Sequence, residues 1–242
     1  MADSHFQRHE IEWTPEKVNR LWDYYSSTGA FDDVYFGFRA GKLFANMLKR
    51  RRLLAQSTNI LDLSCGKGDI ILACSRYLKP GQHISGIDVS EHSIRETIRL
   101  NKSNPHFSGA IHLNDAIHTF QTGSQDLVFS TEVIEHLTDE EVTAFLTESR
   151  RLLGKKGALV LTTPNQEVLD SGKSMCPECG CTFHRWQHRQ SWSPARLTTR
   201  IESAGFRVIE CEPIVWEHWF VNVYFSLAHR KKPGLYLIAE AQ

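Results

Sequence analysis

The chain has 242 residues, of which 41% are hydrophobic, and its 28 Lys and Arg balance its 28 Asp and Glu. This length suits one α/β domain with additions, large enough to bury a sizeable core. The balanced charge gives no indication of a nucleic acid or an anionic membrane as partner. The polar segment 1–12 lacks the apolar core of a secretory signal, and no apolar run approaches the ~20 residues of a membrane span. We therefore expect a cytoplasmic protein without a membrane partner.

The first 55 residues are expected to form an N-terminal helical segment, ahead of a main domain at 56–242. Thr14 followed by Pro15 predicts a helix start, and apolar side chains recur at helical spacing behind them. A second, amphipathic helix is expected from about Gly41 to Arg51.

A glycine-rich turn opens the main domain. The apolar strand Ile60 to Leu63 runs into the small residues Ser64 to Gly68 and then into a helix. The glycines permit a tight turn and let a ligand approach the main chain, while the N–H groups at the start of the helix face that ligand. One βα unit later, Asp88 closes a second strand, where an acid can accept hydrogen bonds from both hydroxyls of a ribose. The fingerprint of a nicotinamide-dinucleotide site requires a third glycine at the position of Ile71. The sequence therefore does not match such a site.

Strands and helices alternate along the rest of the chain. Helices are expected to start at Ser90, Thr138 and Ser193. Further strands are expected at 110–113, 126–130, 157–163, 206–212 and 235–239. The alternation predicts a doubly wound, mostly parallel sheet that binds ligands at the carboxyl ends of its strands.

The pattern acid-x-small-x-Gly-x-Gly at Asp62, Ser64, Gly66 and Gly68 resembles the class I S-adenosylmethionine-dependent methyltransferases. The resemblance implies a seven-stranded Rossmann-like sheet with the N-terminal helices as a lid over cofactor and substrate. The resemblance also implies that the glycine turn holds the methionine part of the cofactor, that Asp88 binds the ribose, and that Asp115 and Ala116 bind the adenine. Ser64 replaces the usual first glycine, which makes the turn less permissive. The implied cofactor-binding residues are Asp62, Ser64, Cys65, Gly66, Gly68, Asp88, Val89, Asp115, Ala116 and Thr131.

Glu132, Glu135 and His136 follow the fourth strand at a spacing that would put them on one side of a helix. Such a set can hold Mg²⁺ or Mn²⁺, or divide the work of a general base and its orienting group, so we predict a catalytic role for all three. The stretch resembles ubiquinone-pathway O-methyltransferases. It also resembles 3′-terminal small-RNA 2′-O-methyltransferases, in which these residue types bind a metal that grips a ribose diol. That second resemblance extends to residues 163–167 and to His188, which matches a fourth metal ligand.

A cysteine cluster predicts a second metal site, in an insertion expected at 166–192. Cys176, Cys179, His184 and His188 have the spacing C-x2-C-x4-H-x3-H, with Cys181 as a substitute ligand. In a cytoplasmic chain such a cluster favours zinc over a disulfide. Four protein ligands would make a closed, structural zinc site. His188 can complete either this set or the Glu132–His136 set, but not both.

The sequence thus predicts a methyltransferase that uses S-adenosylmethionine to methylate a hydroxyl of a small molecule or a glycan. One alternative is a metal-dependent RNA 2′-O-methyltransferase, which would need a basic groove near the acidic residues. Another is a cofactor-binding module that engages a partner without catalysis.

Overall fold

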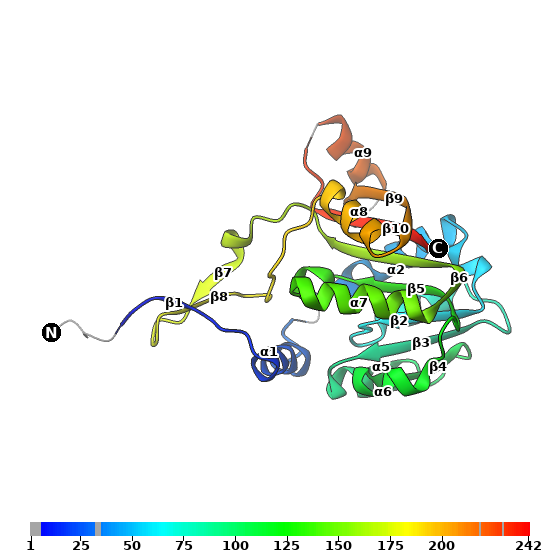
Figure 1. Ribbon diagram of the computed structural model, residues 1–242, viewed down its shortest axis with the longest axis horizontal. Helices are drawn as coiled ribbons and strands as arrows, with labels where there is room; N and C mark the ends of the chain where they lie inside the picture. Colours follow the sequence, from blue (N-terminus) through cyan, green and yellow to red (C-terminus); the bar gives the residue numbers. More distant parts are fainter. Residues whose placement is uncertain (1–5, 32–34, 218, 229) are drawn as a thin grey trace.

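The computed structural model describes residues 6–31, 35–217, 219–228 and 230–242. At its centre lies a seven-stranded sheet in the order β4-β3-β2-β5-β6-β10-β9 (Figure 1). Only β10 runs antiparallel to its two neighbours, β6 and β9. The predicted doubly wound, mostly parallel sheet is confirmed. Its strands are β2 (Asn59–Leu63), β3 (His83–Asp88), β4 (Phe107–His112), β5 (Gln125–Thr131), β6 (Leu153–Pro164), β9 (Phe206–Ile214) and β10 (Gly234–Ala241).

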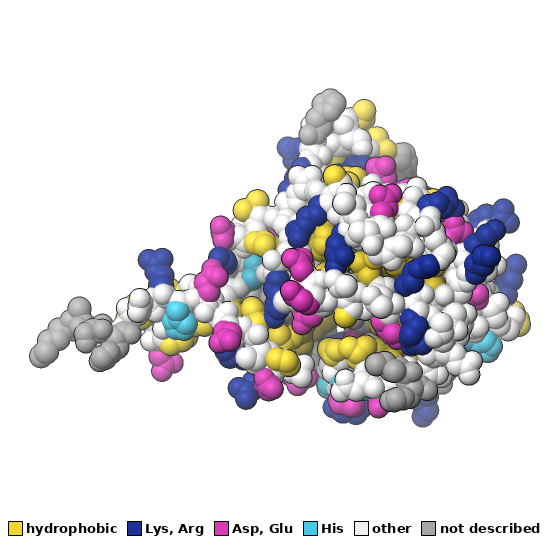
Figure 2. Space-filling model, viewed as in Figure 1, with side chains coloured by type: hydrophobic (Ala, Val, Ile, Leu, Met, Phe, Trp, Pro, Cys, Tyr) yellow, Lys and Arg dark blue, Asp and Glu magenta, His cyan; other side chains and the backbone are white. Residues whose placement is uncertain are grey.

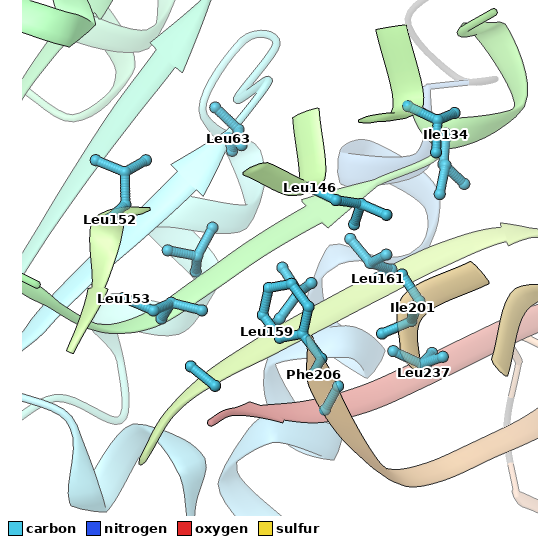
Figure 3. Packing of buried hydrophobic residues seen from close by; sticks show 14 of the residues in the cluster. Leu63, Ile134, Leu146, Leu152, Leu153, Leu159, Leu161, Ile201, Phe206 and Leu237 are labelled. Atoms are coloured by element: carbon cyan, nitrogen blue, oxygen red, sulfur yellow. The ribbon is translucent and has the colours of Figure 1, made fainter. Parts of the chain in front are cut away.

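Helices cover both faces of this sheet, because successive side chains of a strand point to opposite faces. Leu61 joins one buried cluster and Ile60 joins the other. The helices on the Leu61 face are α6 (Leu113–Thr119), α7 (Asp139–Leu152) and α8 (Pro194–Ser203). Those on the Ile60 face are α2 (Phe36–Arg50), α3 (Leu53–Gln56), α4 (Asp69–Ser75) and α5 (Glu91–Leu100). Figure 3 shows the Leu61-face cluster, with Leu161 of β6 between Leu146 of α7 and Ile201 of α8.

The predicted helix starts are present. Thr138 and Glu141 form a reciprocal capping box ahead of α7. The side chain of Ser90 caps α5, and that of Ser193 caps α8. Thr14 caps α1 (Pro15–Ser27), the first helix of the N-terminal segment. These caps satisfy backbone N–H groups that lack a partner in the first turn of a helix.

A small sheet in the order β1-β8-β7 projects from the side of the central sheet, with α1 below it in Figure 1. Its strands are β1 (His9–Glu10), β7 (Lys173–Met175) and β8 (Cys181–His184), and the turn η3 (Leu169–Gly172) precedes β7. Residues near the N-terminus therefore pair with the expected insertion, with His9 opposite Cys181. The remaining helix is α9 (Trp219–Leu227). No helix within the described ranges has the length and apolar character needed to cross a membrane.

Candidate functional site

The turn after β2 has the backbone geometry that its small residues predict. Ser64, Gly66 and Gly68 all have positive φ, at 80°, 53° and 82°. Gly68 is also required for space, because a Cβ there would lie 2.7 Å from Nδ2 of Asn101. Ser64 adopts a conformation that disfavours side chains, which stores roughly 1 kcal/mol or more of strain.

Two buried carboxylates stand beside this turn at the ends of β2 and β3. The side chain of Asp62 is fully buried, and neither of its oxygens has a hydrogen-bond partner. Burial, with a further contribution from Asp88, raises the pKa of Asp62 well above its ordinary value. An orphaned carboxylate behind a glycine turn suits a cationic ligand such as S-adenosylmethionine. Asp62 itself lies behind the wall of the large cavity, whereas Ser64, Gly66 and Asp88 line that cavity, so this part of the site fits the cofactor.

Of the other predicted cofactor residues, some line the large cavity beside the turn and one does not. Thr131 and Ala116 line the same large cavity as the turn, and so does Val89. Asp115 is exposed and is absent from the lining, because α6 begins at Leu113 and turns this side chain outward. Asn114 lines the cavity in its place, a contact that the acid-plus-alanine pattern did not predict.

The cavity has a volume of about 1460 Å³ and extends from the turn to the acidic residues after β5. The helix α1 forms part of its wall, together with the segment 185–189 of the insertion. Trp22 of α1 packs edge-on against the ring of His136, with 5.1 Å between centroids. Nε1 of Trp22 also donates to Oε1 of Gln187 at 3.2 Å. The predicted cofactor turn and the predicted catalytic residues therefore line one half-open cavity.

Glu132, Glu135 and His136 converge, but not on one side of a helix as predicted. Glu132 has a φ of 54°, and only the short 3-10 turn η2 (Ile134–His136) follows it. The side chains are oriented instead by the adjacent strand β6, where Thr162 donates to Oε1 of Glu132 at 2.7 Å and Thr163 donates to Oε2 of Glu135 at 2.9 Å.

Glu135, His136 and His188 form a group that we call the Glu–His site. One potential ligand atom of each lies within 4.8 Å of those of the other two. Oε1 of Glu135 and Nδ1 of His136 are buried without a hydrogen-bond partner. This set of one carboxylate and two imidazoles fits a divalent transition-metal cation such as Mn²⁺ better than Mg²⁺, which prefers oxygen ligands.

Burial strongly affects the titration of these groups. It lowers the pKa of His136 to about 3, so the imidazole is neutral at physiological pH. It raises the pKa of Glu132 to about 7, against the effect of the Thr162 hydrogen bond. It also raises the pKa of Glu135 well above its ordinary value, with a further contribution from Glu132. Groups with such shifts are typical of functional sites.

The four residues predicted as zinc ligands are not brought together. Within the described chain, His184 and His188 group with Glu167, and no cysteine shares a potential metal-ligand group with them. Cys181 and His184 lie at opposite ends of the extended strand β8, about 10 Å apart at ~3.3 Å per residue. The thiols of Cys176 and Cys179 remain adjacent, and backbone N–H groups of Cys179 and Glu178 lower the pKa of Cys176.

Glu167 is the residue of this site whose role the sequence did not predict. Its carboxylate contacts both His184 and His188. The available signal was its place directly after the fifth strand in the stretch Thr-Pro-Asn-Gln-Glu, which ends beside the carboxyl edge of the sheet.

Comparisons with known proteins agree with this geometry. A family model described as a methyltransferase domain matches residues 35–211. The ubiquinone biosynthesis O-methyltransferase of Rhodopseudomonas palustris strain HaA2 is 30% identical over 164 residues, which are 65% of this chain and 61% of that protein. An uncharacterized 37.1 kDa protein in transposon TN4556 of Streptomyces fradiae is 31% identical over 111 residues, 45% of this chain and 31% of that protein. The chain spans less than two thirds of the length of either relative.

Several solved structures share the fold. The PH0226 protein of Pyrococcus horikoshii has a TM-score of 0.65 at 17% identity, covering 91% of this chain and 99% of that one. A SAM-dependent methyltransferase of Aquifex aeolicus has a TM-score of 0.60 at 16% identity, and the match covers 96% of this chain and 100% of that one. The [4+2]-cyclase SpnF has a TM-score of 0.67 at 13% identity, and the match covers 97% of this chain and 99% of that one. At such identities the likeness shows the fold alone.

Proposed function

Because this chain belongs to the class I S-adenosylmethionine-dependent methyltransferases, we propose that it methylates a hydroxyl of an acceptor held by a divalent cation at the Glu–His site. The observation that carries this proposal is the shared cavity, which is lined both by the glycine turn and by Glu135, His136 and His188. Methyl transfer requires the sulfonium methyl and the attacking oxygen to be aligned, and one shared cavity allows both reactants to be held at once.

The chemistry divides among the residues around the Glu–His site. A bound divalent cation would lower the pKa of a coordinated hydroxyl and orient it. Glu135, His136 and His188 would hold that cation, since His136 keeps its lone pair at neutral pH. We assign proton removal to Glu132, because it lines the cavity and its pKa of about 7 suits a general base at neutral pH.

The N-terminal segment and the insertion complete the acceptor side in this proposal. Trp22 covers His136, while Tyr25 of α1 packs against Trp186 with 5.2 Å between ring centroids. We assign the lid function to α1, because α2 packs on α4 within the core of the main domain. The acceptor classes that fit are a small molecule or a glycan with a hydroxyl or a vicinal diol.

An RNA 3′ end is the second candidate acceptor, since its terminal ribose also offers a diol. Arg39, Arg185 and Arg189 line the same cavity and can meet a phosphate. Over the face seen in Figure 2, however, basic and acidic side chains are interspersed, without the continuous basic surface typical of RNA-binding proteins. We therefore favour the small-molecule or glycan acceptor.

A structural zinc ion is proposed for the adjacent thiols of Cys176 and Cys179; among the described residues, Cys181 shares no potential metal-ligand group with them and would have to move to become a third ligand. Backbone N–H groups already favour the thiolate form of Cys176, which is the form that binds zinc. The remaining position would be filled by a group other than His184 and His188.

The test is methyl transfer from isotopically labelled S-adenosylmethionine to diol-containing small molecules, glycans and short RNAs, with Mn²⁺, with Mg²⁺ or with a chelator. We expect turnover that requires the cation and is lost in Glu135→Gln, while cofactor binding is retained. Glu140→Gln is the matched control, because Glu140 is an exposed acid outside the cavity lining. Full activity in the presence of the chelator would contradict the cation part of the proposal.

A further inference from the structure

The carboxylate of Glu167 lies beside two stacked histidine rings, at the edge where each presents a nitrogen. Its Oε2 is 2.5 Å from Nδ1 of His188, and its Oε1 is 3.6 Å from Nε2 of His184. The two rings are stacked, with 4.6 Å between their centroids and an interplanar angle of 20°. One carboxylate thus faces one nitrogen of each imidazole.

Backbone contacts determine which nitrogen of His184 carries the proton. The backbone N–H of His188 donates to Nδ1 of His184 at 3.1 Å. A neutral imidazole that accepts at Nδ1 must be protonated at Nε2. In this state His184 has no lone pair left for a metal, so we regard it as a neighbour whose Nε2–H faces the Glu167 carboxylate at 3.6 Å without being a metal ligand.

His184 is also confined by its packing. A Cβ at residue 172 would lie 1.8 Å from Nε2 of His184, so only the absence of a side chain at Gly172 lets the ring lie against this backbone. The backbone N–H of Arg185 donates to the carbonyl oxygen of Gly172 at 2.9 Å, which joins η3 to the end of β8. The ring of His184 is thereby held beside Glu167 without being a ligand.

Glu167 in turn determines the protonation of His188. A carboxylate only accepts hydrogen bonds, so the contact at Nδ1 requires a proton there and leaves the lone pair on Nε2. The ring of His188 packs edge-on against that of His136, with 4.8 Å between centroids, and His188 belongs to the Glu–His site. A carboxylate on the far nitrogen of a metal-binding histidine fixes the ring and raises its basicity.

We propose that Glu167, supported by His184, is a positioning residue that holds His188 as its Nδ1–H tautomer and so offers Nε2 to the cation at Glu135 and His136. This inference rests on the proposed cation function, but its central claim concerns the metal-free protein. The tautomer and the metal affinity are therefore measured separately.

The first experiment is ¹H–¹⁵N correlation spectroscopy of the histidine rings in metal-free protein, with the His188 signals assigned from their absence in His188→Gln. We expect the wild-type protein to carry the proton of His188 on Nδ1 and that of His184 on Nε2. In Glu167→Ala the Nδ1–H form of His188 should no longer predominate. A wild-type His188 protonated on Nε2 would overturn the proposal.

The second experiment measures Mn²⁺ affinity from the electron paramagnetic resonance signal of the free ion. We expect Glu167→Ala to weaken binding by roughly 10- to 100-fold, and Glu167→Gln, which keeps an oxygen acceptor, to weaken it less. Asp170→Ala is the matched control: its side chain is 85% exposed, it pairs with Lys173, and it should bind Mn²⁺ like the wild type.

The two readouts separate the possible failures. The spectra could show an Nδ1–H tautomer of His188 that depends on Glu167 in a protein that binds no Mn²⁺. That result would contradict the cation function and the metal role of Glu167, but it would support the positioning of His188 by Glu167. Unchanged Mn²⁺ affinity in Glu167→Ala, with loss of binding in His188→Ala, would overturn the positioning role itself. Thermal unfolding of each variant shows whether a loss reflects misfolding.

Discussion

The backbone N–H of Gly66 donates a hydrogen bond to Oδ2 of Asp88 at 2.8 Å. The other carboxylate oxygen of Asp88 accepts from the backbone N–H of Ser90 at 2.9 Å. The glycine turn after β2 and the acid at the end of β3, which are separate motifs in the sequence, are therefore one hydrogen-bonded unit. Asp88 both shapes the turn and lines the cofactor side of the cavity.

Asp88→Ala is expected to weaken binding of S-adenosylmethionine by about 10- to 100-fold. Hydrogen bonds to a charged group contribute roughly 1.5–3 kcal/mol, and each ~1.4 kcal/mol is a factor of ten in affinity. Isothermal titration calorimetry measures the loss. The conservative Asp88→Asn should retain part of the affinity, because its amide still offers one acceptor. Wild-type affinity in Asp88→Ala would contradict the assignment of the cofactor site.

Asp62→Asn should change stability and cofactor binding in opposite directions. The buried carboxyl group of Asp62 has no partner, and burial disfavours its ionised form, so an amide, which cannot ionise, avoids the cost of charging this site above the ordinary pKa. We expect a higher melting temperature of the cofactor-free protein together with weaker binding of S-adenosylmethionine. Differential scanning fluorimetry with and without cofactor measures both effects. A lower melting temperature without cofactor would mean that this carboxylate stabilises the fold.

The stability of the cofactor-free protein should also depend on pH through Asp62. Burial raises the pKa of Asp62 in the folded state, so the folded protein holds this proton more tightly than the unfolded chain does. Protonated Asp62 therefore favours the folded state. This stabilisation is fully present below the pKa of Asp62 in the unfolded chain, and it is lost as pH rises through the higher pKa of the folded protein. One group changes the free energy of unfolding by at most about 1.4 kcal/mol per pH unit. In urea unfolding, stability should fall more steeply with pH for the wild type than for Asp62→Asn, and equal slopes would contradict this.

The cysteines should divide into reactive and protected groups. Backbone N–H groups lower the pKa of Cys176, and Cys179 is exposed, whereas burial raises the pKa of both Cys65 and Cys74. With a chromogenic disulfide reagent and a chelator at neutral pH, we expect the metal-free first pair to react rapidly and the second pair only after unfolding. The double variant Cys176→Ser/Cys179→Ser should lose the rapid phase. A rapid phase that appears only after chelation would support zinc at these thiols, and rapid labelling of Cys65 or Cys74 would contradict the burial described here.

Much of the site could be predicted because its signals are local. The positive φ at Ser64 and Gly68 follows from the turn that their small side chains permit, and the side chain of Ser90 caps its helix within one turn of itself. The prediction was wrong where the orientation of side chains depends on contacts with another strand. Helical spacing predicted one shared face for Glu132 and Glu135, but Thr162 and Thr163 on a neighbouring strand orient these carboxylates instead.

By itself the sequence determined the strands of the central sheet, the helix caps, the glycine turn and the residue types available for chemistry, because these depend on interactions between residues near one another in the chain. It did not predict the small sheet β1-β8-β7. Only the tertiary structure decided which partners His188 takes. Its neighbours Glu135 and His136 come from the segment after β5, and Glu167 comes from the segment after β6. Spacing along the chain carries no information on how an insertion docks against a sheet edge. Packing in three dimensions brought His188 to carboxylates and to another imidazole, and left Cys176, Cys179 and Cys181 at the connection between β7 and β8.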